Sequence, residues 1–143
     1  MRPRAHSRRR FLLLAAAGVA AAAGKVGNAW GLTPGIKGPK DHPVPRPGID
    51  ASRVLPDSSL ADYSGAIPAF QAAREIPQIV DGIRCQCGCA TLPGFYSLLS
   101  CYEGEAMARF CDICQGEARL ALRLHRAGKS LDEIRDAIDA RYG

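Results

Sequence analysis

The sequence predicts a mainly α-helical fold: a small cysteine-rich helical domain, stapled by a thiolate metal site or by disulfides, after a disordered proline-rich tether. All six cysteines of the 143-residue chain lie within the 30 residues from Cys85 to Cys114. Apolar residues around and after them recur at helical spacing, and no convincing alternating strand pattern occurs. A domain this small buries little core and needs such staples.

The chain divides into a signal peptide (1–29), a Pro/Gly-rich linker (30–59) and the helical domain (60–143). Arg8-Arg9 followed by Phe11-Leu12 is the twin-arginine form of a signal. The apolar run after it, 11–23, has 13 residues, whereas a membrane span needs about 20. We therefore expect the twin-arginine machinery to export the protein to the periplasm or cell envelope. Any membrane contact would be made through an uncleaved signal.

The positive charge of the chain belongs to the signal. The formal net charge is +5, and residues 1–29 hold six of the 19 basic residues and no acidic one. The remainder has 13 basic and 14 acidic residues. Nucleic-acid binding is not expected, because it requires clustered Lys and Arg on the folded part.

The linker is defined by proline. Six prolines lie between residues 34 and 56, interleaved with glycine and charged residues. Such composition predicts an extended, semi-rigid spacer without a core. His42, which lies within it, is interpreted as a solvated linker histidine.

Four helical segments are expected in the domain, besides one or two helical turns over 95–102. A short helix over 66–75 has Pro68 in its first turn, and the chain breaks before a further turn at 77–81. A longer helix runs from Ile113 to about Ala127, with Asp112 as its N-cap. Ser130 and Glu133 form a capping box for the last helix. Its apolar stripe consists of Leu131, Ile134, Ile138 and Tyr142.

The cysteines are arranged as C-x-C-x-C (Cys85, Cys87, Cys89), a lone Cys101, and C-x-x-C (Cys111, Cys114). The first three either face one way on a strand or converge in a tight loop, for which Gly88 gives the backbone freedom. The helix dipole stabilises thiolates in the C-x-x-C motif.

Thiolates are soft ligands that select copper(I), zinc or iron–sulfur sites. All six cysteines are therefore candidate metal ligands, for copper or zinc: Cys85, Cys87, Cys89, Cys101, Cys111 and Cys114. Five or six thiolates exceed one tetrahedral zinc and suit a thiolate-bridged copper cluster or zinc with spare thiols. Met107 is interpreted as a gap-filling core residue, and His125 lies too far along its helix to join the site.

Residues 65–143 resemble the PCYCGC-motif (CYCxC) proteins. The resemblance is carried by Ile76-Pro77, 84–89, 97–102, 111–114, 128–130 and 134–139. It implies an exported bacterial protein from a family without a firmly assigned activity, and selenocysteine in some members implies a reactive thiol. Here Arg84 stands in place of the Pro of the motif, and Gln86 stands in place of its Tyr. The lipobox that many members carry is also missing. Phe95 and Met107 stand where many relatives have histidines, which leaves an all-sulfur site.

The sequence favours a non-catalytic role, because no Ser/His/Asp set or carboxylate pair has a local signature. The metal would be structural, stored, or delivered to an envelope metalloprotein or oxidase. An alternative is a thiol–disulfide redox protein with a Cys111/Cys114 dithiol. A further alternative is a structural module of three disulfides.

Overall fold

A computed structural model describes residues 41–143 of the chain. The predicted signal peptide (1–29) and the first part of the predicted linker (30–40) lie outside the described residues. The α-helices are α2 (Ile67–Glu75), α3 (Pro77–Asp81), α4 (Asp112–Arg126) and α5 (Leu131–Tyr142). Four 3₁₀ segments join them: η1 (Asp57–Ala66), η2 (Cys89–Thr91), η3 (Leu98–Tyr102) and η4 (Met107–Arg109).

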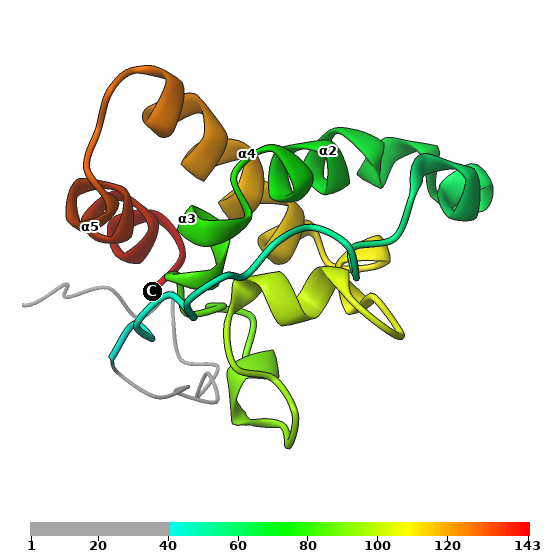
Figure 1. Cartoon of the computed structure of the whole chain (residues 1–143), viewed down its shortest axis with the longest axis horizontal. Coiled ribbons are helices and arrows are strands. Elements are labelled where there is room, and N and C mark those ends of the chain that lie inside the picture. Colours follow the sequence, from blue (N-terminus) through cyan, green and yellow to red (C-terminus); the bar gives the residue numbers. More distant parts are fainter. Residues whose placement is uncertain (1–40) are drawn as a thin grey trace, which may run out of the picture. The chain divides into compact units, whose positions relative to one another are not determined.

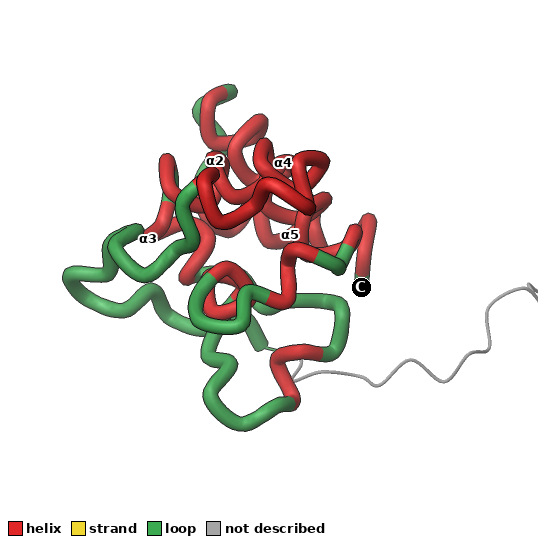
Figure 2. The backbone as a smooth tube through the Cα atoms, turned by 90° about the vertical axis from the view of Figure 1, so that its right-hand side faces the viewer, coloured by secondary structure: helices red, strands yellow, loops and turns green. Residues whose placement is uncertain are grey.

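The predicted mainly helical fold is confirmed. No strand occurs between residues 41 and 143, where the β structure is limited to one antiparallel bridge between Val54 and Glu103. Helix α4 packs against α2 and α5 (Figure 1). The loops and short helical turns gather on one side of these helices (Figure 2).

Most helix boundaries follow the local signals. Pro68 lies in the first turn of α2, and α3 begins at Pro77. The capping box of Ser130 and Glu133 starts α5. The predicted cap of α4 is wrong by one residue. Cys111 is the N-cap, since its backbone is extended and its thiol accepts the Cys114 N–H, while Asp112 lies inside the helix.

The core links the helices to the cysteine loops. Phe70 of α2 and Tyr102 of η3 are fully buried and meet edge to face, with ring centroids 4.8 Å apart. The Tyr102 hydroxyl donates a hydrogen bond of 2.7 Å to the Cys114 carbonyl. Ile134 and Ile138 of the predicted α5 stripe are fully buried. Apolar burial of this kind supplies the main driving force for folding.

The prediction that residues 41–59 form a spacer without a core is wrong. These residues belong to the same compact unit as the helices. Val54 is buried in the core, and the Leu55 N–H donates to the Tyr102 carbonyl at 3.2 Å. We call residues 41–56 the strap. Proline restricts the unfolded chain, so an extended proline-rich segment loses less conformational entropy when it docks.

Asp81, at the end of α3, anchors the strap. Its carboxylate is fully buried and accepts hydrogen bonds from the backbone and guanidinium of Arg46, the shortest being 2.6 Å. The Ser97 hydroxyl donates to the same carboxylate at 2.7 Å. A buried carboxylate requires such partners, because an unpaired charge is costly in the interior.

Gly82 marks the place where the strap, α3 and α5 meet. A Cβ built on Gly82 would lie 2.8 Å from Leu131 Cδ2 and 2.9 Å from Pro45 Cγ. Its φ of −86° is available to alanine, so the cost of a side chain is steric.

We expect Gly82→Ala to destabilise the fold by about 1–3 kcal/mol, the usual cost of overpacking. Gly65→Ala is the control, because nothing lies within 4 Å of a Cβ there. Denaturant unfolding of the reduced chain would measure both. Equal stabilities for the two variants would contradict the observed contact.

None of the helices between residues 41 and 143 has the length and apolar character that a membrane span requires.

Candidate metal centre

Four thiols converge on one point. The sulfur atoms of Cys85, Cys87, Cys89 and Cys114 all lie within 4.8 Å of one another. Cys87 is 3.0 Å from Cys85 and 2.9 Å from Cys89, and Cys114 is 3.4 Å from both Cys85 and Cys87. We call these residues the thiol cluster.

Two separate parts of the chain build the cluster. The C-x-C-x-C motif forms a tight turn rather than a strand, and Gly88, at φ +88°, has the left-handed conformation that glycine favours. Cys114 comes from the first turn of α4, where the N-terminal end of the helix stabilises negative charge. Packing of α4 against α3 therefore brings the two parts together.

The remaining two cysteines border the cluster. Cys101 of η3 is fully buried, and its thiol influences the pKa values of Cys85, Cys87 and Cys114. The Cys111 thiol accepts the Cys114 N–H at 3.5 Å and influences the pKa values of Cys87 and Cys114. All six cysteines carry free thiols. The structure thus groups four of the six predicted ligands within 4.8 Å of one another, and Cys101 and Cys111 lie outside that group.

The cluster is not fully enclosed. Cys85, Cys89, Cys101 and Cys114 are buried, whereas Cys87 and Cys111 are half-buried. Solvent or a metal ion can therefore reach the cluster beside these two residues, and also beside the exposed Met107, whose Sδ lies 3.9 Å from the Cys89 sulfur.

The thiols divide into acidic and weakly acidic ones. Hydrogen bonds from Cys101, then from Cys114 and Cys87, lower the pKa of Cys85 to about 2. Those from Cys101, Cys111 and Cys114 lower the pKa of Cys87 to about 3. Burial, followed by the hydrogen bond with Cys87, raises the pKa of Cys89 to about 12. Neighbouring thiols thus favour the thiolate form of Cys85 and Cys87, and a cation can replace the shared protons.

A buried carboxylate lies beside the thiols. Glu117 is fully buried on α4, and its Oε1 accepts the Gln86 N–H at 2.8 Å. Its Oε2 has no hydrogen-bond partner among the described residues. Burial raises the pKa of Glu117 to about 8. Sequence reasoning missed this residue, although a Glu three residues after Cys114 shares its helix face.

Asp139 of α5 positions the C-x-C-x-C turn from outside. Its carboxylate accepts hydrogen bonds from the side chains of Gln86 and Arg84, the latter at 3.3 Å. His42 Nε2 lies 3.2 Å from the other carboxylate oxygen. The sequence carries no local signal for this role, because the partners are more than 50 residues apart.

His42 is not a solvated linker histidine, which corrects the sequence prediction. Its side chain is 12 % exposed. Nδ1 accepts the Arg84 N–H at 3.0 Å, which leaves the proton on Nε2, facing Asp139. Burial lowers the pKa of His42. Both ring nitrogens are engaged, so His42 supports the fold next to the cysteine turn.

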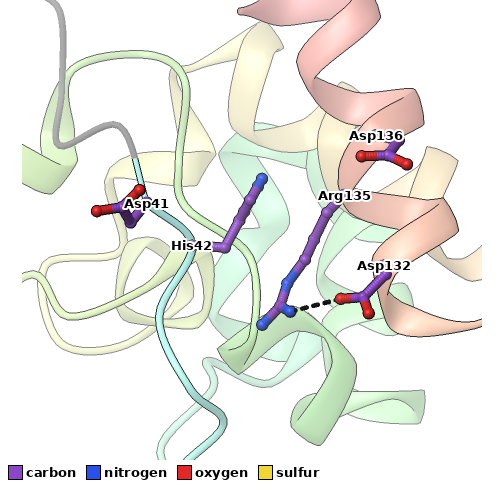
Figure 3. Close-up of a pocket in the computed structure, with 5 residues that line it drawn as sticks. All are labelled: Asp41, His42, Asp132, Arg135 and Asp136. Atoms are coloured by element: carbon purple, nitrogen blue, oxygen red, sulfur yellow. Dashed lines mark hydrogen bonds and ion pairs between the residues drawn. The ribbon is translucent and has the colours of Figure 1, made fainter.

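A cavity of about 330 Å³ lies against the strap and α5. It is lined by Asp41, His42, Asp132, Arg135 and Asp136 (Figure 3). Arg135 donates to the carbonyls of Gly82 and Pro43 and pairs with Asp132. These contacts hold the strap on α5. We therefore interpret the cavity as a gap between packed elements and not as a binding site.

Met107 and His125 are the two residues that the sequence analysis weighed as ligands and set aside. Met107 is 37 % exposed, and its Sδ lies 3.9 Å from the Cys89 sulfur, so its interpretation as a core residue is wrong. His125 is exposed near the C-terminal end of α4, far along the helix from Cys114.

Comparison with protein-family models, with curated proteins and with solved structures finds no match for this chain. The kind of protein can therefore be inferred only from the fold and the site. The chain contains a small helical domain with a cluster of free cysteine thiols that has the ligands to hold a metal ion.

Proposed function

We propose that this protein is an exported, non-catalytic metal-binding protein that holds copper(I) or zinc through clustered thiolates. The observation that carries the proposal is the convergence of four thiols within 4.8 Å of one another. Buried thiols in a core need not meet, and soft thiolates in one place are the preferred ligands of these two metals. The metal serves as a structural element, or is stored or passed to an envelope metalloprotein or oxidase.

The spacing of the sulfurs supports metal binding. Zinc–sulfur bonds of about 2.3 Å place tetrahedral ligands about 3.8 Å apart. Four of the six separations in the cluster are 2.9 to 3.4 Å and all are within 4.8 Å, so a small adjustment of the turn would bring them to this value. Cys101 and Cys111 supply the extra sulfurs that a bridged copper(I) cluster would use.

The main alternative is a thiol–disulfide redox protein. The Cys111/Cys114 pair begins a helix, as redox pairs do. Cys114, however, belongs to the buried cluster, and hydrogen bonds with Cys101 and its other thiol neighbours raise its pKa. An isolated, exposed dithiol suits exchange with partners better than one enclosed by four other thiols.

The test is the metal content of the full chain purified anaerobically from the cytoplasm, with free thiols counted before and after chelation. We expect at least one equivalent of copper or zinc and few reactive thiols until a chelator is added. A chain without metal whose thiols oxidise in pairs to a stable folded form would support the redox alternative. We also propose that the chain is related to the PCYCGC-motif proteins.

Export has its own test. We expect Arg8→Lys with Arg9→Lys to hold the protein in the cytoplasm, because twin-arginine recognition requires the paired guanidinium groups. The control variant, Arg2→Lys with Arg4→Lys, also replaces two arginines by lysines of the same charge, but outside the pair. It should leave export intact. Fractionation followed by immunodetection would measure both variants. Equal export of the two would contradict the twin-arginine assignment.

A further inference from the structure

Met107 brings a seventh sulfur to the edge of the thiol cluster. Its thioether sulfur lies 3.9 Å from the Cys89 thiol. Met107 and Met1 are the two methionines of the chain. A flexible apolar side chain gains most by burial, yet Met107 is 37 % exposed, whereas its neighbours Ala106 and Ala108 are buried. Filling the core therefore does not explain where Met107 lies.

The backbone before Met107 is strained. Ala106 has φ +46°, and it is the only non-glycine residue with positive φ in the part of the chain that the structure describes. Such a conformation costs about 1–3 kcal/mol and persists where the surrounding structure imposes it.

Hydrogen bonds within the loop impose this conformation. The Ala106 N–H donates to the Glu103 carbonyl at 2.8 Å, and the Arg109 N–H donates to the Ala106 carbonyl at 3.0 Å. The Arg109 guanidinium also donates to the Glu105 carbonyl at 2.7 Å. The loop thus holds η4 in a defined place, with its first residue, Met107, against Cys89.

The chemistry of the thioether distinguishes between the two candidate metals. A thioether is neutral, soft and has no proton to release, and together with thiolates it selects copper(I). Zinc in proteins is bound by thiolate, imidazole and carboxylate ligands. A methionine at the rim therefore adds affinity for copper(I) and none for zinc.

We propose that Met107 is a copper(I) ligand at the exposed edge of the thiol cluster, where it and Cys89 receive and release the ion. This inference rests on the proposed metal-binding function. On release to an acceptor with two thiols, the copper–sulfur bonds to Met107 and Cys89 break as two bonds to the acceptor form. Copper stays monovalent, no electron is transferred, and Cys89 regains a proton that an acceptor thiol loses.

The first measurement is the NMR spectrum of the reduced full chain labelled with ¹³C-methyl methionine. Met107→Leu, which nearly conserves volume, assigns the Met107 signal by its loss. We expect copper(I) to shift that signal and zinc to leave it nearly unchanged. A signal that copper(I) does not move would overturn the inference.

The second measurement compares metal affinities by competition, with bicinchoninate for copper(I) and a zinc chelator for zinc. We expect Met107→Leu to weaken copper(I) binding about tenfold, the low end of the loss caused by removing a group that supports a metal ligand, because the thiolates still hold the ion. Zinc binding should be unchanged. Ile113→Leu is the matched control, since Ile113 is also apolar, 38 % exposed and lies next to cluster residues in sequence. It should change neither affinity.

The outcomes separate the two proposals. Copper(I) binding by the wild type without a methionine shift, or equal weakening of both metals by Met107→Leu, overturns the role of Met107 alone. Zinc binding without copper(I) binding also overturns it and leaves the metal-binding function standing. Failure to bind either metal overturns both.

Discussion

Replacing Cys114 by serine should weaken metal binding by about a hundredfold or more. Four-ligand structural zinc sites contribute about 10–16 kcal/mol, so one thiolate corresponds to roughly 3 kcal/mol, or two powers of ten. Cys114 lies 3.4 Å from both Cys85 and Cys87 and joins α4 to the C-x-C-x-C turn. Chelator competition on the reduced full chain would measure the loss.

Cys111→Ser is the matched control for this experiment. Cys111 lies three residues earlier and is half-buried, outside the tightest group of four thiols. We expect a smaller loss of affinity from it than from Cys114→Ser. Circular dichroism of both metal-free variants would show whether the helices persist. Equal affinities for wild type and Cys114→Ser, with the fold intact, would refute the assignment of Cys114 as a ligand.

Replacing Asp81 by alanine should destabilise the fold by about 3 kcal/mol, the low end of the cost of breaking a buried ion pair. The low end applies because Arg46 is 34 % exposed and partly screened by solvent, whereas the Asp81 side chain is 0 % exposed. The change leaves Arg46 and Ser97 without their shared acceptor. Denaturant unfolding would measure the loss, and hydrogen exchange would show whether the strap detaches.

Asp132→Ala is the control, because the Asp132 side chain is 86 % exposed in its pair with Arg135. Exposed pairs of this kind contribute about 0–1 kcal/mol. A similar effect of both changes would show that the strap is not anchored at Asp81.

The pH dependence of the Asp81 effect has a defined sign. Burial raises the pKa of Asp81, but the hydrogen bonds from Arg46 and Ser97 outweigh it and hold the pKa below the usual 3.8. The carboxylate therefore contributes its full stability above the unfolded pKa, and the contribution is lost as pH falls through the lower folded value. The difference between wild type and Asp81→Ala should shrink in that acidic range and stay constant near neutral pH.

Much of the fold could be predicted from local sequence. Pro68, Pro77 and the Ser130/Glu133 box are recognisable because proline geometry and side-chain capping act within one helical turn. The 30-residue cysteine window predicted a shared site, because a short loop-rich segment leaves few ways to keep thiols apart. Gly88 made a turn possible, because its conformational freedom is a property of the residue itself, but the sequence left both a strand and a turn open for the C-x-C-x-C motif.

The strap, Glu117, Asp139 and Met107 were decided by the tertiary structure. Proline-rich composition describes a free segment correctly, but it cannot show that Arg46 will meet a buried carboxylate 35 residues away. The contacts of Asp139 with Gln86 and of Met107 with Cys89 likewise join residues that are distant in sequence. The sequence by itself thus determined the helices and the thiol chemistry, because both depend on local residue types. The tertiary structure decided which thiols meet and what surrounds them, because long-range packing has no local signature.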